Sequence, residues 1–334
     1  MPLAPYIKPH VEFLLAWGKK GSLVGEFNTP EGVAVDSLGN VYVADFANQR
    51  VQKFDDSGTY ITEISGIGNP TDVAVDSSGN VYVVDNTGNR ILKFDSSLTL
   101  EAGLGSFGTG DYQFNGPYGV AVDSSGDYVY VTDNGNNRIL KYASSLTDPG
   151  SYLAQWGAAP PAYTPGTGNG QFNSPARVAV NNYGYVYVTD SGNNRVQKFD
   201  SSGDYVTKWG SFGSGDGQFN RPVGVAVCPL FPFYPSPPPW NPRPGLPVRD
   251  AVVIADFNNN RVQLFWTATG ATTPVEYMTQ WGSRGSADGQ FNEPSGVACI
   301  PYAEIIASLG QYIVDLGNNR VQKFVTLLYH AVPL

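Results

Sequence analysis

Near its start the chain reads Gly-Val-Ala-Val-Asp at 32–36, then Gly-Asn-Val-Tyr-Val-Ala-Asp at 39–45, then Asn-Gln-Arg-Val-Gln-Lys-Phe-Asp at 48–55. Each stretch alternates apolar with polar residues or is rich in β-branched residues, which is typical of β-strands. The residues between the stretches, such as Asp-Ser-Leu-Gly-Asn at 36–40, tolerate left-handed backbone and favour tight turns. This part of the chain therefore predicts three antiparallel strands joined by short turns.

The same pattern recurs along the whole sequence. An Asp is followed five residues later by an Arg in six places: Asp45/Arg50, Asp85/Arg90, Asp133/Arg138, Asp190/Arg195, Asp256/Arg261 and Asp315/Arg320. A fourth strand with an aromatic residue near its end follows in several copies, as at 152–156, 205–209 and 277–281. Each repeat thus predicts a four-stranded antiparallel sheet, and the spacing of 40 to 66 residues between successive Asp residues is near that of propeller blades.

A single sheet of this kind cannot cover both of its apolar faces, so the sheets are expected to pack radially into a closed ring. The last repeat has strands near 296–300, 312–315 and 320–325 but no fourth strand, whereas residues 11–17 near the N-terminus read like the fourth strand at 205–209. The sequence predicts an all-β, six-bladed β-propeller of four-stranded antiparallel blades, closed by an N-terminal strand that completes the last blade. We expect a single domain over 11–325, a Pro-rich insertion at 229–249 in blade five, and tails at 1–10 and 326–334.

The repeat pattern resembles a known family. Gly-Glu-Phe-Asn-Thr-Pro at 25–30, followed by the strand sequences above, resembles the NHL repeat, whose tandem copies form six-bladed β-propellers. The resemblance covers about residues 11–325. It implies the fold, whereas the family includes ligand-binding platforms, RNA readers, sensor domains and a metal-dependent amidating lyase, so it does not decide the function.

The residues shared by the repeats are expected to maintain the fold. The Asp and Arg of each copy end one strand and begin the next, so we interpret them as bridges within the hairpin or between blades, with the intervening Asn satisfying turn amides. We expect the Phe side chains of the Phe-Asn motifs to fill the seams between blades: Phe27, Phe114, Phe172, Phe219 and Phe291.

Composition argues against several chemistries. The only histidines, His10 and His330, lie in the expected tails, so neither the zinc site of the family's lyase nor a Ser-His-Asp or Cys-His hydrolase is expected. We expect no cofactor and no metal; the alternative is one structural calcium ion bound by the Asp-containing turns. The 20 Lys and Arg residues are outnumbered by 29 acidic residues and are distributed around the ring, which disfavours nucleic-acid binding.

Departures from the repeat are the better guide to a ligand site. Four blades begin their first strand with Pro-x-Gly, but blade two has Asp72 and blade four has Arg177 in place of that Gly. Glu31 and Tyr118 occupy the preceding position in blades one and three. We expect these four polar groups to lie at the mouth of the central channel, where they could line a small pocket; the alternative is ordinary variation at the rim.

A second departure follows the repeat Asp. This position is apolar in blades one, five and six, where it holds Phe46, Phe257 and Leu316, and these blades are contiguous in a closed ring. We therefore expect an apolar arc on the upper face that serves as a partner-binding surface. The alternative is that the rings are packing elements.

Cys228 and Cys299 lie at nearly equivalent places, at the ends of the first strands of adjacent blades. Either they form a disulfide or they remain free buried thiols, because adjacent inner strands are not hydrogen-bonded and their α-carbons can be too far apart for a bridge.

Composition also suggests where the protein acts. A net charge of −9 with only 15% charged residues favours an extracellular, cell-surface or periplasmic location, although residues 1–10 contain no hydrophobic signal segment. No stretch is apolar enough to predict a membrane span.

We expect a non-enzymatic interaction or scaffold module that binds a protein, peptide or glycan through its upper face. The alternative is a lyase-like or hydrolase-like enzyme with its site at the channel mouth.

Overall fold

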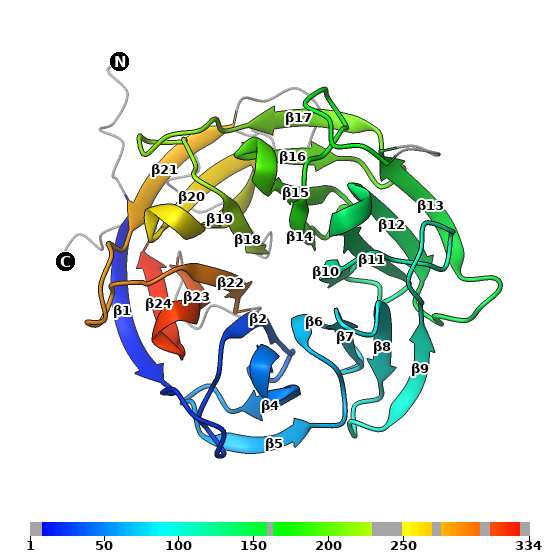
Figure 1. Cartoon of the computed structure of the whole chain (residues 1–334). Helices are drawn as coiled ribbons and strands as arrows, with labels where there is room; N and C mark the ends of the chain where they lie inside the picture. The colour runs from blue at the N-terminus through cyan, green and yellow to red at the C-terminus, as the bar shows by residue number, and fades with distance from the viewer. Residues whose placement is uncertain (1–8, 159–162, 229–248, 269–274, 301–307, 328–334) are drawn as a thin grey trace, which may run out of the picture.

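The computed structural model describes residues 9–158, 163–228, 249–268, 275–300 and 308–327. They form six four-stranded antiparallel sheets around a central axis (Figure 1), as the sequence predicted. Among the described residues no helix has the length and hydrophobicity needed to cross a bilayer.

The strands of each blade run from the axis outward in chain order, except in blade six. Blade one contains β2 (Pro30–Val35), β3 (Val41–Asp45), β4 (Arg50–Phe54) and β5 (Tyr60–Ile64); blade two contains β6 (Pro70–Val75), β7 (Val81–Asp85), β8 (Arg90–Phe94) and β9 (Leu100–Leu104); blade three contains β10 (Pro117–Val122), β11 (Tyr128–Asp133), β12 (Arg138–Ala143) and β13 (Tyr152–Gly157). Blade four contains β14 (Pro175–Val180), β15 (Val186–Asp190), β16 (Arg195–Phe199) and β17 (Tyr205–Trp209); blade five contains β18 (Pro222–Cys228), β19 (Arg249–Asp256), β20 (Arg261–Ala268) and β21 (Glu276–Trp281); blade six contains β22 (Pro294–Cys299), β23 (Ser308–Asp315) and β24 (Arg320–Leu327).

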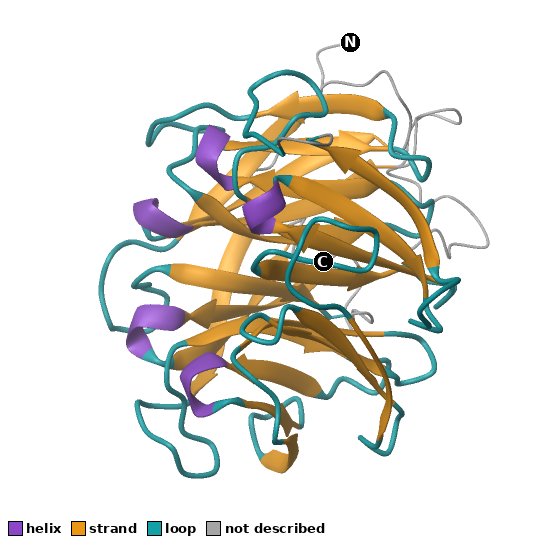
Figure 2. Cartoon of the chain, turned by 45° about the vertical axis from the view of Figure 1, so that its right-hand side comes forward, coloured by secondary structure: helices purple, strands orange, loops and turns teal. Residues whose placement is uncertain are grey.

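Two kinds of connection define two faces of the disc. Five short 3-10 helices follow the second strand of a blade: η1 (Phe46–Asn48), η2 (Asn134–Asn136), η3 (Ser191–Asn193), η4 (Phe257–Asn259) and η5 (Leu316–Asn318). They lie on one side of the molecule (Figure 2). We call this side the upper face. It also carries the linkers, the segments that join the outer strand of one blade to the inner strand of the next. The remaining turns lie on the lower face.

In blades one to three the turn between the first two strands is held by the Asp that follows the first strand. Asp36 accepts hydrogen bonds from the backbone amides of Leu38 and Asn40 through one carboxylate oxygen, at 2.9 and 2.8 Å. Gly39 between them has a φ of +86°, which explains the Gly at this place in the turn.

Blade six is completed by β1 (His10–Trp17), which pairs antiparallel with β24 from His10 opposite Leu327 to Trp17 opposite Val321. The predicted closure by the N-terminal strand is therefore confirmed. The expected domain bounds shift slightly, because β1 begins at His10 and β24 continues to Leu327. Arg249 begins β19, and the rest of the Pro-rich insertion lies outside the described residues.

Aromatic rings fill the seams between blades, as expected. The Phe side chains of the five Phe-Asn motifs are fully buried. Phe27, for example, packs against Phe54 of blade one, with ring centroids 5.6 Å apart, in a cluster that also contains residues of blade six. A Cβ added at Gly18 would lie 2.4 Å from the Phe27 ring, and the φ of Gly18 is +97°, so only glycine fits beneath this ring.

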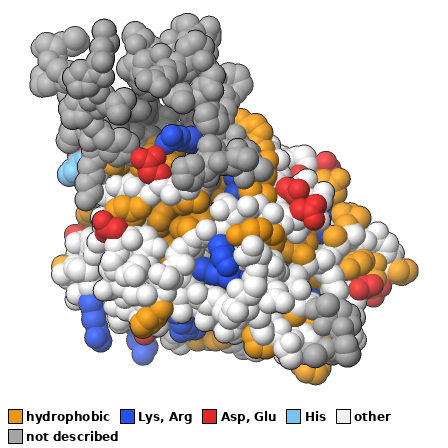
Figure 3. Space-filling view, turned by 90° about the horizontal axis from the view of Figure 1, so that it is seen from above, with side chains coloured by type: hydrophobic (Ala, Val, Ile, Leu, Met, Phe, Trp, Pro, Cys, Tyr) orange, Lys and Arg blue, Asp and Glu red, His pale blue; other side chains and the backbone are white. Residues whose placement is uncertain are grey.

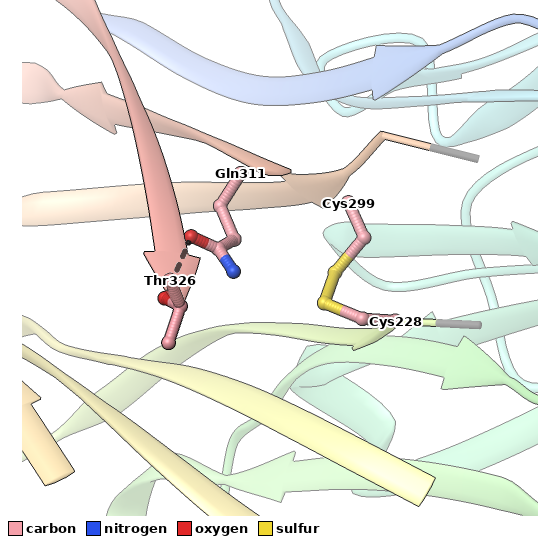
Figure 4. The surroundings of a disulfide bond; sticks show 4 residues. All are labelled: Cys228, Cys299, Gln311 and Thr326. Carbon is pink, nitrogen blue, oxygen red and sulfur yellow. Dashed lines mark hydrogen bonds between the residues drawn. A yellow bond between two sulfur atoms is a disulfide. The ribbon is translucent and has the colours of Figure 1, made fainter. Parts of the chain in front are cut away.

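The two cysteines form a disulfide (Figure 4). Cys228 at the end of β18 and Cys299 at the end of β22 have α-carbons 5.1 Å apart, so the concern that adjacent inner strands are too distant is wrong here. The bond joins the inner strands of blades five and six at their lower ends. Nearby, the buried Gln311 accepts a hydrogen bond from the Thr326 hydroxyl at 3.2 Å.

Removal of residues 1–18 tests the closure. It should leave the edge of β24 unpaired and expose the ring of Phe324, against which Phe13 packs at 5.8 Å. We expect the midpoint of thermal unfolding to fall by roughly 10 °C or more, or the protein to aggregate. Removal of residues 1–8, which leaves β1 intact, is the control. Equal melting temperatures for the two truncated proteins would contradict the assignment of β1.

Candidate functional site

The repeated Asp–Arg pair is a clamp for the linkers. In every blade the Arg Nε donates to the Asp Oδ2 at 2.6 to 2.9 Å. The other carboxylate oxygen accepts the backbone amide of the linker Asn at 2.7 to 2.8 Å in five blades: Asn28, Asn115, Asn173, Asn220 and Asn292. Burial raises the pKa of Asp133, Asp190 and Asp256, although bonds from the backbone and from the Arg partly offset this effect. The structural interpretation of the pair agrees with this geometry.

In five blades the residue before the repeat Arg is an Asn that connects neighbouring blades. Asn319, for example, has a φ of +54°, and its side-chain oxygen accepts the backbone amide of Thr29 in the next linker at 2.9 Å. Asn89, Asn137, Asn194 and Asn260 make the same bond to the linker that follows them. An Asn at this place therefore combines a left-handed backbone, which it tolerates well, with a contact across the seam.

Glycine at the start of the inner strands allows close approach around the axis. A Cβ added at Gly296 would lie 2.6 Å from the carbonyl oxygen of Glu31, and one added at Gly224 would lie 2.5 Å from that of Ser295. Asp72 and Arg177 depart from this pattern, and both side chains turn into the axis.

The structure brings all four expected channel-mouth residues together. The Arg177 guanidinium, from blade four, crosses the axis to form an ion pair with Asp72 of blade two. Its Nη2 lies 3.5 Å from the carboxylate of Glu31 in blade one, and the Tyr118 hydroxyl of blade three donates to the same carboxylate oxygen at 2.7 Å. The Tyr118 ring lies against the guanidinium at 5.3 Å. The four groups occupy the axis and pair with one another. Arg177 is only 3% exposed.

Burial dominates the electrostatics of this cluster. It raises the pKa of Asp72 to about 6, although Arg177 opposes the effect, and it also raises the pKa of Glu31 and of Tyr118. Burial alone would lower the pKa of Arg177, but the nearby carboxylates of Asp72 and Glu31 raise it overall. The ion pair is therefore formed at neutral pH and is lost as the pH falls below about 6. Because the pKa of Asp72 in the folded protein lies above its ordinary value of 3.8, protonation of this carboxyl favours the folded state.

The predicted apolar arc is only partly exposed. Phe257 is 7% exposed and packs with Ala176 and Val223 over the axis, with Tyr118 and Leu316 against them. Its ring also lies 4.7 Å from the Arg221 guanidinium. The expectation of an exposed docking ring is therefore wrong for Phe257, because Ala176 and Val223 of the neighbouring inner strands cover its ring. Phe46 and Leu316 are half-buried.

Sequence reasoning missed the apolar groups that stand out on the upper face. Phe107 and Phe212 are each 70% exposed, and Leu23 is equally exposed on the linker into blade one. The signal was present in the sequence. Phe107 and Phe212 occupy the same place in their linkers, after Gly-Ser, where the corresponding residues of other linkers are Lys20 and Arg284.

The lower face has a cavity of about 210 Å³ between blades one and two. Lys53, whose Nζ lies 3.5 Å from Asp36, forms one wall, and Ser77, Ser78 and Ser96 form another. In the part of the chain that the structure describes, no group of three or more His, Cys, Asp or Glu side chains could hold a metal ion.

The NHL-repeat family model matches residues 27–54, 68–94, 114–142 and 172–199, which cover the inner three strands of blades one to four. The chain is an NHL-repeat protein. Among curated proteins, Protein lin-41 of Caenorhabditis elegans is 48% identical over 50 residues, and NHL repeat-containing protein 3 of Homo sapiens is 41% identical over 58 residues. These alignments cover 15% and 16% of this chain, and 4% and 17% of the two relatives.

Solved structures share the fold of this NHL-repeat chain at low sequence identity. A streptogramin B lyase structure has a TM-score of 0.56 at 14% identity and covers 96% of this chain and 99% of its own. An auxiliary nutrient binding protein from Bacteroides ovatus has a TM-score of 0.61 at 15% identity, covering 96% and 77%. A nidogen/laminin complex contains a chain with a TM-score of 0.51 at 16% identity, covering 78% and 87%. At these identities the likeness shows the fold alone.

Many basic residues of the NHL-repeat ring form ion pairs and hydrogen bonds within the fold. Arg50, Arg138, Arg195 and Arg261 are buried in the clamps. In the view of Figure 3, Lys and Arg side chains are scattered and form no continuous patch. Buried guanidinium groups cannot gather phosphates, so the absence of nucleic-acid binding stays a prediction that the charge distribution supports.

The channel cluster can be tested with a double-mutant cycle. Arg177→Gly should leave Asp72 without its ion-pair partner and lower the free energy of unfolding by about 3 kcal/mol. Asp72→Gly/Arg177→Gly restores the glycine present in the other four blades and should recover at least half of that loss. Urea unfolding of the single and double variants measures the free energy of unfolding that each variant loses. If the losses simply add, the two side chains are not coupled.

Proposed function

We propose that this protein is a non-enzymatic interaction module that binds a protein, peptide or glycan through the upper face of the propeller. The observation that carries the proposal is the exposure of Phe107 and Phe212, at 70% each, on linkers that the Asp–Arg clamps hold in place. Their neighbours in the same linkers, Phe114 and Phe219, are fully buried in the seams.

These rings have the properties of binding anchors. Fully burying a Phe side chain contributes roughly 1.5 to 3 kcal/mol, and aromatic side chains are enriched among the residues that dominate interface affinity. Each linker is also ordered before binding. The backbone amide of Phe219 donates to the Ser211 carbonyl at 2.8 Å, and that of Gly213 donates to the Phe219 carbonyl at 3.0 Å. A partner therefore meets a ring that is attached to an ordered backbone, which lowers the conformational entropy lost on binding.

Single exposed apolar residues are common on proteins, and the lower face has its own, Leu38 and Tyr183. What favours the upper face is repetition, because the two Phe side chains stand at the same position of two linkers in blades three and five. The fold accommodates this use, since the solved structures that share it include one described as a nutrient binding protein and one chain of a nidogen/laminin complex.

Catalysis at the channel mouth is the second candidate, and one observation favours it. Asp72, with its pKa raised to about 6, lies beside Arg177 and Tyr118, and perturbed carboxyl groups are frequent in active sites. The proposal of binding is stronger because these side chains are buried and already paired. Among the solved structures that share the fold, a virginiamycin B lyase lacking one histidine is described as catalytically inactive. In this chain His10 lies in β1 at the outer edge of blade six.

We also propose that the protein acts in an extracytoplasmic location. The disulfide between Cys228 and Cys299 supports it, because such bonds persist mainly in oxidising compartments.

The variant Phe107→Ala/Phe212→Ala tests the binding surface. The partner is first captured from extract of the native source with the intact protein, and its affinity for purified variants is then measured. We expect binding to weaken about tenfold or more, because two anchors of roughly 1.5 to 3 kcal/mol each are removed. The melting temperature should change little, since both rings are exposed.

The matched control is Leu38→Ala/Tyr183→Ala, which removes exposed apolar side chains from the lower face. It should bind like the unmodified protein. If the control loses affinity and the Phe107/Phe212 variant keeps it, the partner binds the lower face and the proposal is wrong.

A further inference from the structure

The linker into blade two is shorter than the others. It has five residues, 65–69, whereas four of the remaining linkers have 12, at 18–29, 105–116, 210–221 and 282–293. In the longer linkers the additional residues form a small hairpin, as shown by the bonds that join Phe219 to Ser211 and Gly213. Blade two has no such hairpin of its own.

In the other five blades the repeat Arg binds this hairpin through its backbone. In blade five, Nη2 of Arg261 donates to the carbonyl oxygens of Gly215 and Gln218 at 2.9 and 2.8 Å. Two carbonyls three residues apart are bound in the same way, at 2.8 to 3.0 Å, by Arg50, Arg138, Arg195 and Arg320. The protein thus contains five copies of one recognition event between a guanidinium and a short polypeptide loop.

Arg90 is the sixth guanidinium, and it lacks this loop. Its Nε donates to Asp85 at 2.8 Å, but neither Nη nitrogen has a hydrogen-bond partner among the described residues. Its side chain is 44% exposed, whereas those of the other five repeat Arg residues are at most 12% exposed.

Neighbouring positions in blade two do not replace the missing partners. In blades one, three and five, Nη1 of the repeat Arg also bonds a side chain of the outer strand: Glu63, Gln155 and Gln280. The equivalent residue opposite Leu92 in blade two is Gly103. The hydrophobic core beneath is nonetheless closed, because Ile67 fills the seam and is 7% exposed.

We propose that the upper face of blade two is a binding site for a loop of a partner protein, which presents backbone carbonyl oxygens to the Nη groups of Arg90 in place of the missing hairpin. This inference rests on the proposed function and names the partner class and one point of contact. The site lies next to the linker that carries Phe107, because Gly105, which precedes it, packs on the backbone of Arg90. One partner could therefore contact both.

The geometry favours a polypeptide loop over an anion. The Nε of Arg90 is bonded to Asp85, so the guanidinium is fixed in the orientation that the five clamped Arg residues share. The pair with Asp85 is neutral overall, and in all five internal precedents Nη2 binds two uncharged carbonyls, whereas only Arg50 also binds a second carboxylate within 3.5 Å, that of Glu63. A carboxylate gains less from a guanidinium that is already paired with an Asp than from an unpaired one.

The test uses a fluorescent head-to-tail cyclic peptide of residues 212–218, which carries the Gly215 and Gln218 carbonyls in a closed loop. Anisotropy titrations are made with the intact chain, with Arg90→Lys, and with Arg284→Lys as the matched control on another exposed linker position. Lysine keeps a cation beside Asp85 but lacks the fork of two Nη groups. Sodium acetate is titrated as a competitor.

We expect the peptide to bind the intact chain and Arg284→Lys equally and Arg90→Lys at least fivefold more weakly, with no displacement by acetate. Absence of binding to the intact chain, or equal binding to Arg90→Lys, overturns the inference. Displacement by acetate at equimolar concentration also overturns it, because the site then recognises carboxylates. If the peptide fails while the native partner still depends on Phe107 and Phe212, only this inference falls. If the partner binds the lower face, the proposed function falls.

Discussion

The buried ion pair between the repeat Asp and Arg is the interaction on which the rest of the structure depends. In five blades each pair has two tasks, because the Asp holds the amide of the linker Asn while the Arg holds linker carbonyls. The strands of a blade are thereby fixed to the segment that enters it, and the Phe of that segment is placed in the seam. A buried ion pair is costly to desolvate, and it is tolerated here because almost every remaining donor and acceptor finds a backbone partner.

The same arrangement explains why departures from the repeat carry information. Where the axis is lined by glycine, neighbouring inner strands touch through their backbones; where Asp72 and Arg177 replace glycine, the axis is filled by charge. Where a linker is short, a guanidinium that is otherwise enclosed faces solvent. Both departures lie on the upper face, where the side chains of Phe107 and Phe212 are also exposed. The proposed binding function uses these features, all of which lie on the upper face of the disc.

The fold could be predicted almost completely from the sequence, because six copies of one pattern fix strand order, turn positions and closure. Convergence of Glu31, Asp72, Tyr118 and Arg177 was also predictable, since all four occupy one of two adjacent positions at the start of the inner strands. The hydrogen bonds and ion pairs that these four side chains form with one another could not be predicted, because they depend on how far each side chain extends across the channel. Phe257 was misjudged because its burial depends on packing against Ala176 and Val223 of other strands, which its place in the repeat does not reveal. The disulfide could not be decided because strand order does not give the distance between adjacent inner strands.

The central claim, that the repeat Arg stabilises the fold by clamping a linker, is tested most directly by the same substitution in two blades. Arg195→Lys and Arg90→Lys both keep a cation beside their Asp, but only Arg195 donates to linker carbonyls, those of Gly168 and Gln171. The free energy of unfolding, measured in urea, should fall by about 2 kcal/mol or more for Arg195→Lys, because buried carbonyls lose charge-assisted bonds, and by less than about 1 kcal/mol for Arg90→Lys. Equal losses for the two variants would contradict the account, since the linker would then contribute nothing to what the pair stabilises.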